Sequence, residues 1–386
     1  MRLFCVFFSL MAVAITATAA EFEFTFPGSH DGSTQQGFAF APDGTTAESA
    51  PMPLLVVAHF MGGDRYTGKN SGYHKEAAER GWLVVTPELH GKNTPGGKTS
   101  FAAREAQSDV LDSIAYMQEN FPVDKNRIYI VGRSMGGMMT QLMMAKHPDI
   151  FAAGVAGQGC GNITRLDQLA KVVADSAKKE CGDDPFEYER RSSHSYAPNF
   201  AYAPLIMWHG TNDAFVHCDQ TRELERAIKE HQTDAVPVFY LPGNSHLDRN
   251  VSAKWVCDQL EPYSNFSDFG TPYRWYPSLN FVTDESQKFF YLEIEIADKD
   301  KFAKIDTTIS PPAEYALSVR GYEPSGDLAM WFATENVASL TIDLDAIPKE
   351  FHPKFFVNIS TTGSDPKVYV IRDGEKSKID VAYAAQ

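Results

Sequence analysis

The stretch NRIYIVGRSMGGMMTQLMMAKH, residues 126–147, decides the fold. It begins with a short run rich in Ile and Val, typical of a strand buried on both faces of a parallel sheet, and it ends with a helix-forming run. Between the two runs, Gly132-Arg133-Ser134-Met135-Gly136 forms a G-x-S-x-G pattern. Only glycine fits two residues before and after the serine in so tight a turn, so Ser134 is predicted to stand exposed at the start of a helix. The alternative is a plain turn serine.

Segments of the same kind recur on both sides of this stretch. Buried strands are predicted at 53–60, 81–88, 151–159, 203–210 and 236–243, and helices at 74–80, 101–119 and 219–231. An antiparallel entry strand at 21–26 and a second strand at 37–42 are expected before them, with the turn of the second strand at Asp43-Gly44. Strand and helix in alternation predict an α/β domain with a doubly wound, mostly parallel sheet over residues 21–262. The ligand site of such a sheet lies beyond the carboxyl ends of its strands.

Three further regions are expected. Residues 161–202 are too long for a simple connection and are interpreted as a lid-like insertion with a helix at 167–179, the alternative being a solvated excursion remote from the site. Residues 263–280 form an aromatic linker, which either contacts substrate or packs between domains. Residues 281–386 are predicted to form a β-rich, sandwich-like C-terminal domain, with strands at 288–298, 301–310, 314–323, 338–347, 354–362 and 367–374.

The first twenty residues, MRLFCVFFSLMAVAITATAA, have one arginine, an apolar run and then small residues. This pattern is typical of a secretory signal peptide, so residues 1–20 are expected to be removed and the protein to be secreted or periplasmic. A membrane anchor is the alternative, but the apolar run is shorter than the ~20 residues that a spanning helix needs. No span is expected elsewhere in the chain.

Export to an oxidising compartment would favour disulfide bonds between cysteines. Cys160, Cys181, Cys218 and Cys257 would remain after the signal peptide, and one or two disulfides are expected among them, with the pairing open. Their spacing fits no zinc-binding pattern.

The composition restricts the classes of partner that the protein can bind. The chain of 386 residues has 35 Lys and Arg against 50 Asp and Glu, a net charge of −15, so nucleic acid is an unsuitable partner. The hydrophobic share of 43% is that of an ordinary globular protein. The oligomeric state is not predictable from these features.

A serine needs a base to take its proton and an acid to orient that base. The strand at 203–210 runs into Asp213, and the strand at 236–243 runs into His246, so both partners follow Ser134 in order on loops at the carboxyl edge. Asp213 would accept a hydrogen bond from the ring of His246. Asp219 and Asp248 are rival acids, but the first should begin a helix and the second follows the histidine. Other histidines could line the site, namely His59, His90, His194, His209 and His217.

A tetrahedral intermediate would need two hydrogen-bond donors for its oxyanion. The first predicted donor is the backbone N–H of Met135, directly after the serine. The second is the backbone N–H of Met61, in the loop HFMGG that follows the strand at 53–60.

The motifs HFMGG, GRSMGG, HGTND and GNSH together resemble the α/β-hydrolase superfamily over residues 21–262, and within it the secreted esterases of the polyhydroxybutyrate depolymerase and feruloyl esterase-like group. Many such esterases have glycine after the oxyanion-loop histidine, where this chain has Phe60. The resemblance implies a secreted serine hydrolase that cleaves carboxylic esters of small or polymer-linked substrates through an acyl-enzyme, without metal or organic cofactor. A peptidase of the prolyl oligopeptidase-like type and a non-catalytic binding protein on the same fold are the alternatives.

Overall fold

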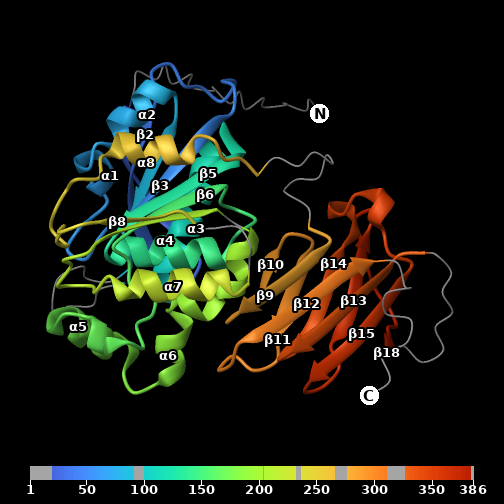
Figure 1. Ribbon diagram of the computed structural model, residues 1–386. Coiled ribbons are helices and arrows are strands. Elements are labelled where there is room, and N and C mark those ends of the chain that lie inside the picture. The colour runs from blue at the N-terminus through green and yellow to red at the C-terminus, as the bar shows by residue number, and fades with distance from the viewer. Residues whose placement is uncertain are drawn as a thin grey trace, which may run out of the picture.

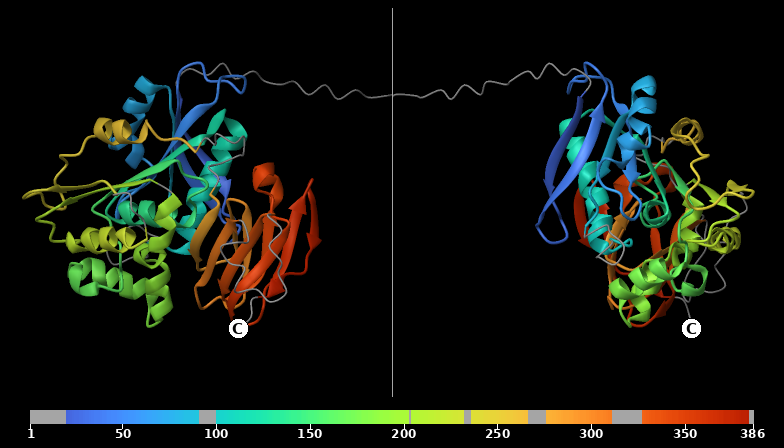
Figure 2. Two further views of the ribbon diagram at one scale, coloured as in Figure 1. Left: turned by 45° about the vertical axis from the view of Figure 1, so that its right-hand side comes forward. Right: turned by 90° about the vertical axis from the view of Figure 1, so that its left-hand side faces the viewer.

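The computed structural model describes residues 20–90, 100–202, 204–231, 236–265, 276–310 and 327–383 (Figure 1). Residues 1–19 of the expected signal peptide, most of the aromatic linker (266–275) and the strand expected at 314–323 lie outside the described residues. The described part divides into an α/β region and a β-rich C-terminal region, which lie side by side in Figures 1 and 2.

An eight-stranded sheet forms the centre of the α/β region, in the order β1-β2-β4-β3-β5-β6-β7-β8. Its strands are β1 (Ala20–Pro27), β2 (Thr34–Ala41), β3 (Met52–Ala58), β4 (Leu83–Pro87), β5 (Val123–Arg133), β6 (Ala153–Gly157), β7 (Leu205–Gly210) and β8 (Val238–Leu241). The strands β4, β3, β5, β6, β7 and β8 are neighbours in that order and run parallel. The β1–β2 hairpin joins the edge of this parallel part antiparallel to β4. The predicted mostly parallel sheet is therefore confirmed, and the carboxyl ends of its parallel strands meet at one edge.

Helices cover both faces of this sheet. They are α1 (Thr67–Asn70), α2 (Tyr73–Arg80), α3 (Arg104–Asn120), α4 (Met135–Lys146), α7 (Asp219–Lys229) and α8 (Ala253–Leu260). Within β3, Leu54 and Val56 join the apolar cluster of α3, α4 and α7, whereas Leu55 and Val57 join that of α2 and α8. Successive side chains of a strand point to opposite faces, so both sides of this strand are buried, and its run is apolar throughout.

The insertion at 161–202 is helical for most of its length. It comprises η1 (Leu166–Gln168), α5 (Lys171–Cys181), α6 (Pro185–Arg190) and η2 (Ser193–Tyr202). The helix expected at 167–179 is thus interrupted, because Leu169 has extended backbone and pairs with Val216 in an isolated bridge. The segment η2 packs against both α4 and α7, which ties the insertion to the sheet's helical layer.

The C-terminal region contains two five-stranded sheets, in the orders β10-β11-β14-β16-β17 and β18-β15-β13-β12-β9. One apolar cluster draws on both sheets, as expected for a sandwich. The strands are β9 (Ser278–Thr283), β10 (Gln287–Phe289), β11 (Leu292–Ile296), β12 (Ala303–Ser310), β13 (Ala329–Glu335), β14 (Val337–Asp343), β15 (Phe355–Thr362), β16 (Lys367–Arg372), β17 (Glu375–Lys378) and β18 (Ala382–Tyr383), with short helices η4 (Leu344–Ala346) and η5 (Lys349–Phe351). The run expected as one strand at 288–298 is two, because the chain turns at Phe290, where φ is +48°.

A buried ionic network joins the two regions. Asp284, directly after β9, is fully buried and lies 2.8 Å through Oδ1 from Nζ of Lys146, the last residue of α4. Arg104 donates to the same carboxylate from Nη2 at 3.1 Å, and the Tyr196 hydroxyl donates to it at 2.8 Å. Burial alone would raise the pKa of Asp284, but the charge of Lys146 and the surrounding donors outweigh it and lower the pKa. The interface is thus specified by charge as well as by apolar packing.

The predicted disulfides are absent: Cys160, Cys181, Cys218 and Cys257 are all buried as free thiols. Cys257 lies in the apolar cluster under α8, on the opposite face of the sheet from Cys160 and Cys181. A buried cysteine can serve as a small hydrophobic residue, and sequence spacing does not reveal on which face of a sheet it lies.

Candidate functional site

Ser134 stands at the sharp turn between β5 and α4. Its backbone angles are φ +58° and ψ −123°, a region that residues other than glycine rarely occupy. A Cβ added at Gly132 would lie 2.2 Å from the carbonyl oxygen of Gly136, and one added at Gly136 would lie 2.1 Å from that of Ala58. Both glycines are therefore required by close backbone approach, as the sequence pattern predicts.

The structure brings Ser134, His246 and Asp213 into one hydrogen-bonded chain. Nε2 of His246 lies 2.9 Å from Oγ of Ser134, and Nδ1 of the same ring lies 2.6 Å from Oδ2 of Asp213. The acid and the histidine are only 4% and 7% exposed, whereas Ser134 is partly open to solvent. With Nδ1–H donating to Asp213, Nε2 is free to accept the serine proton.

The Asp213 carboxylate is held from several directions. Its Oδ1 accepts hydrogen bonds of 2.9 Å from the backbone N–H groups of Phe215 and Val216. Nε2 of the buried His209 lies 3.3 Å from Oδ2. Burial would raise the pKa of Asp213, but the hydrogen bonds from His209 and His246 outweigh it and hold the pKa below its ordinary value. The acid is accordingly ionised, as a partner for an imidazolium must be.

Two further residues in this cluster have roles that the sequence does not reveal. His209 was expected only as a residue that could line the site, yet its ring connects Asp213 to Thr221, whose Oγ1 lies 2.7 Å from Nδ1. Phe215, which is partly exposed, stacks on the His246 ring with centroids 5.3 Å apart. Its position two residues after the acid is the one sequence signal that could have indicated it.

The loop after β3 lies against the first turn of α4. The Cβ position of Gly136 is 3.0 Å from the carbonyl oxygen of His59, so the loop passes beside the backbone N–H of Met135. Nδ1 of His59 lies 3.1 Å from the Phe60 carbonyl oxygen, and Nε2 accepts from the Leu89 N–H at 3.1 Å. Burial lowers the pKa of His59, so its ring is neutral, and its two contacts support the loop. The backbone N–H of Met61 has no acceptor among the described residues, which leaves it available to a ligand.

The insertion at 161–202 contacts the loop after β7 that contains Asp213, called here the acid loop. Ala170 N–H donates to the Phe215 carbonyl at 2.8 Å, and His217 N–H donates to the Gln168 carbonyl at 2.9 Å. These bonds, with the Leu169–Val216 bridge, hold the segment from which Phe215 covers His246. The insertion is therefore in contact with the loop that contains Asp213.

The rival residues lie apart from the hydrogen-bonded chain. Asp219 begins α7 and pairs with Arg222, and Oδ2 of Asp248 accepts from the Ser245 N–H. His90 contacts Asp109 and Asp31. His217, Cys218 and Asp219 offer three potential metal-ligand atoms within 4.8 Å of one another, but Asp219 is already paired with Arg222.

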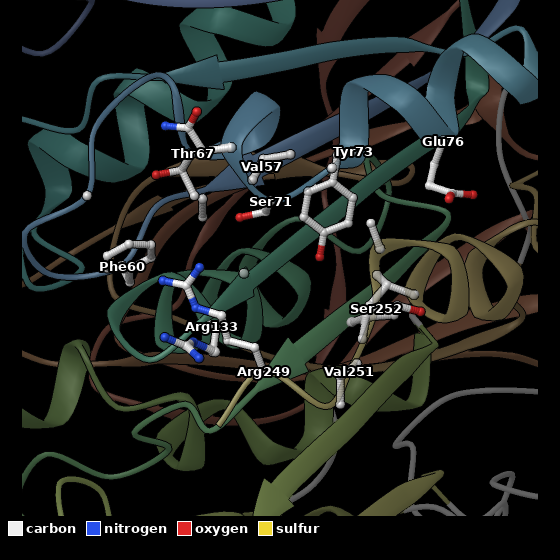
Figure 3. Close-up of a pocket in the computed structure, with 18 of the residues that line it drawn as sticks. Val57, Phe60, Thr67, Ser71, Tyr73, Glu76, Arg133, Arg249, Val251 and Ser252 are labelled. Carbon is white, nitrogen blue, oxygen red and sulfur yellow. The ribbon is translucent and has the colours of Figure 1, made fainter. Parts of the chain in front are cut away.

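A cavity of about 590 Å³ adjoins the sharp turn between β5 and α4, called here the elbow, which carries Ser134 (Figure 3). It is bounded by the loop after β3, by α1 and α2, by Gly132 and Arg133 of the elbow, and by the segment 248–254 that follows His246. Its size is within the ~300–1,000 Å³ of small-molecule sites.

Comparison with known proteins identifies relatives of the α/β region. The profile of the prolyl oligopeptidase family matches residues 73–265. An acetylxylan esterase of Coprinopsis cinerea is 27% identical over 208 residues, which are 49% of this chain and 54% of the relative. A feruloyl esterase B of Talaromyces stipitatus is 24% identical over 214 residues, 52% of this chain and 58% of the relative. The chain therefore spans little more than half the length of these relatives.

Among solved structures, an acylaminoacyl peptidase of Pyrococcus horikoshii has a TM-score of 0.51 and is 20% identical, covering 64% of this chain and 41% of its own. At that identity the likeness concerns the fold alone. In the part of the chain that the structure describes, no helix has the length and apolar character needed to cross a membrane.

Proposed function

Because the chain belongs to the prolyl oligopeptidase family, and because Ser134, His246 and Asp213 form one hydrogen-bonded chain, we propose that it is a serine hydrolase that cleaves carboxylic esters. The observation that carries the proposal is the 2.9 Å contact between Nε2 of His246 and Oγ of Ser134. The names of the two esterases that match about half of the chain support an ester, rather than an amide, as the substrate.

The reaction follows from this geometry. Oγ of Ser134 attacks the ester carbonyl carbon while Nε2 of His246 takes the serine proton, and Asp213 stabilises the imidazolium. The backbone N–H groups of Met135 and Met61 hold the oxyanion of the tetrahedral intermediate. The imidazolium then gives its proton to the departing alkoxide, which leaves as the alcohol. Water, deprotonated by His246, attacks the acyl-enzyme; when the second tetrahedral intermediate collapses, Oγ of Ser134 leaves and takes that proton from His246, and the carboxylic acid is released.

The surroundings of the triad support the same assignment. The insertion at 161–202 holds the acid loop, and Phe215 covers one face of the His246 ring, so we assign the insertion a role in shaping the substrate site. We also propose that residues 1–20 direct the protein out of the cytoplasm and are removed, on the basis of their sequence pattern. Mass spectrometry of the exported chain would test this, with Glu21 as the expected first residue.

A peptidase is the second candidate, because the matching family is named for an oligopeptidase. The same three side chains would cleave an amide. The discriminating experiment compares p-nitrophenyl esters with aminoacyl p-nitroanilides. We expect the esters to be turned over at least 100-fold faster in kcat/KM; a preference for the anilides would favour the peptidase.

A labelling experiment tests whether the protein is an enzyme at all. A fluorophosphonate probe should label the protein, and Ser134→Ala should abolish both labelling and ester hydrolysis. Ser49→Ala, in the loop before β3, is the matched control and should leave both unchanged. If the unaltered protein takes up no label, the proposal fails and a non-catalytic binding role is favoured.

A further inference from the structure

The cavity beside the elbow has two arginines at one end. Figure 3 shows the guanidinium groups of Arg133 and Arg249 pointing into it, one from the elbow and one from the segment after His246. The two cations are near enough for Arg249 to lower the pKa of Arg133, in addition to the lowering that burial causes. Two like charges in one cavity repel, and a bound anion would relieve that repulsion.

Neither arginine forms an ion pair with a carboxylate of the protein in the described part of the chain. Arg133 donates to the backbone carbonyl of Asp248 at 3.4 Å and lies over the Phe60 ring at 5.8 Å, but it forms no ion pair among the described residues. Arg249 has neither a hydrogen bond nor an ion pair within the described residues. Asp213 acts on Arg133 through its charge and raises its pKa, but the Asp213 carboxylate is hydrogen-bonded to His246.

None of the three carboxylates that line the cavity forms an ion pair with either arginine among the described residues. Oδ2 of Asp248 accepts from the Ser245 N–H at 2.6 Å, and Oδ1 of Asp64 accepts from the Tyr66 N–H at 2.9 Å. Glu76 forms an ion pair with Arg80 at 3.5 Å. The other cations at the rim are themselves paired: Lys254 with Asp258, and Lys75 with Glu79. The two arginines are thus the cations of this cavity without a carboxylate partner.

A polar side chain faces them. Figure 3 shows the hydroxyl of Tyr73 directed into the cavity towards the two arginines. Burial raises the pKa of this hydroxyl, while the charge of Arg133 acts in the opposite direction, so the phenol is a neutral donor close to Arg133. Two guanidinium groups and a hydroxyl match a carboxylate, which accepts several hydrogen bonds and binds arginine in a fork.

We propose that this cavity binds a carboxylate of the substrate, so that the preferred ester carries a free carboxylate on its acid or its alcohol half, as a half-ester of a dicarboxylic acid or a uronic acid acylated on a hydroxyl group does. The inference rests on the proposed esterase function. It adds Arg133 and Arg249 as specificity-determining residues, since Arg133 directly precedes Ser134 and a bound carboxylate would lie beside the reacting ester.

The experiment compares kcat/KM for matched charged and neutral esters. The first pair is mono-p-nitrophenyl adipate and its methyl ester, with the carboxylate on the acyl side. The second pair is 3-acetoxybenzoate and its methyl ester, with the carboxylate on the alcohol side. We expect the charged member to be preferred at least tenfold in one pair, because a fork of charge-assisted hydrogen bonds is lost in the methyl ester.

Arg249→Gln should reduce that preference at least fivefold. Lys254→Gln removes the same charge from the same cavity but from a lysine already paired with Asp258, and it should change the preference less than about twofold, as expected for an exposed ion pair. Equal turnover of both members of both pairs, with p-nitrophenyl esters still cleaved, would overturn the carboxylate site and leave the esterase function standing.

A binding measurement is independent of turnover. In the Ser134→Ala protein, adipate should raise the midpoint of thermal unfolding, and Arg249→Gln in that background should reduce the rise by at least half. If no ester is cleaved, the proposed function fails while this measurement still decides the carboxylate site: an equal rise, or none, with and without Arg249 would refute it.

Discussion

Asp213→Asn tests the assignment of the acid, and the structure fixes how the new side chain must lie. Oδ1 of Asp213 accepts two backbone N–H groups, from Phe215 and Val216. Because an amide can satisfy these donors only with its oxygen, the new NH₂ group must take the place of Oδ2, facing Nδ1 of His246.

This orientation sets the tautomer of the imidazole. Nδ1 must then accept the amide proton, so the ring proton moves to Nε2, which can no longer accept from Ser134. We expect kcat for p-nitrophenyl acetate to fall about 10⁴-fold. That loss corresponds to about 5.5 kcal/mol of activation free energy. The NH₂ group also opposes Nε2 of His209, so the free energy of unfolding should fall by about 1–3 kcal/mol.

The control is Asp219→Asn, which removes the neighbouring acid of the same chain segment. Asp219 is partly exposed and pairs with Arg222, so kcat should stay within about twofold. Steady-state kinetics of the folded variants, checked by circular dichroism, decides the matter. If Asp213→Asn keeps more than a tenth of kcat, or Asp219→Asn loses as much, the assignment of the acid is refuted.

Three further predictions concern the interior. Lys146→Met leaves Asp284 buried without its closest cation, and the free energy of unfolding should fall by about 3 kcal/mol in denaturant titrations, with kcat/KM nearly unchanged; no loss of stability would show that Arg104 suffices. Burial and the charge of Lys146 lower the pKa of His147 to about 4. Between pH ~6.5 and ~4 the unfolded chain therefore binds a proton at His147 that the folded chain does not bind. The free energy of unfolding should fall as the pH falls through this range. The loss is at most about 3 kcal/mol. Because burial raises the pKa of Asp109 and of Asp149 to about 6, which acts in the opposite direction, the test is the difference in thermal midpoint between wild type and His147→Gln across this range; parallel curves would contradict it. Finally, Cys160, Cys181, Cys218 and Cys257 should all react with a thiol reagent after denaturation and none before it, because burial raises the pKa of Cys160 to about 12; fewer reactive thiols would reveal a disulfide.

The sequence predicts the α/β sheet well because its signals are local. Each parallel strand is an apolar run ended by glycine or polar residues, and the glycines around Ser134 are required by backbone contacts within the turn itself. The positions of Asp213 and His246 were predictable for the same reason, since each follows a strand of that sheet. The strand β13 was missed, although its run AMWFATE is buried on nearly every residue. Such a run lacks the alternation expected of a sandwich strand.

Other features depend on contacts between distant segments. Cys257 has no disulfide partner because α8 covers the opposite face of the sheet from Cys160 and Cys181. The spacing of the cysteines along the sequence does not indicate which face a helix covers. His209 lies only four residues before Asp213, but the 3.3 Å contact between the two side chains is set by the turn of the chain after β7, which the sequence pattern does not specify. The position of Arg249 beside Arg133 is likewise a product of the fold, since 115 residues separate Arg133 from its contact Asp248.

The two ends of α4 have separate physical tasks. Its first turn supports Ser134 and presents the Met135 N–H, while its last residue, Lys146, enters the ionic network of the C-terminal region. At about 1.5 Å per residue, the helix separates these ends by about 18 Å. A buried pair at one end therefore acts on the other only through the position of the helix, which the apolar packing of Met138, Leu142 and their neighbours against the sheet fixes independently. The C-terminal region thus stabilises the helix that begins beside the proposed nucleophile Ser134, at the end of the helix away from that residue.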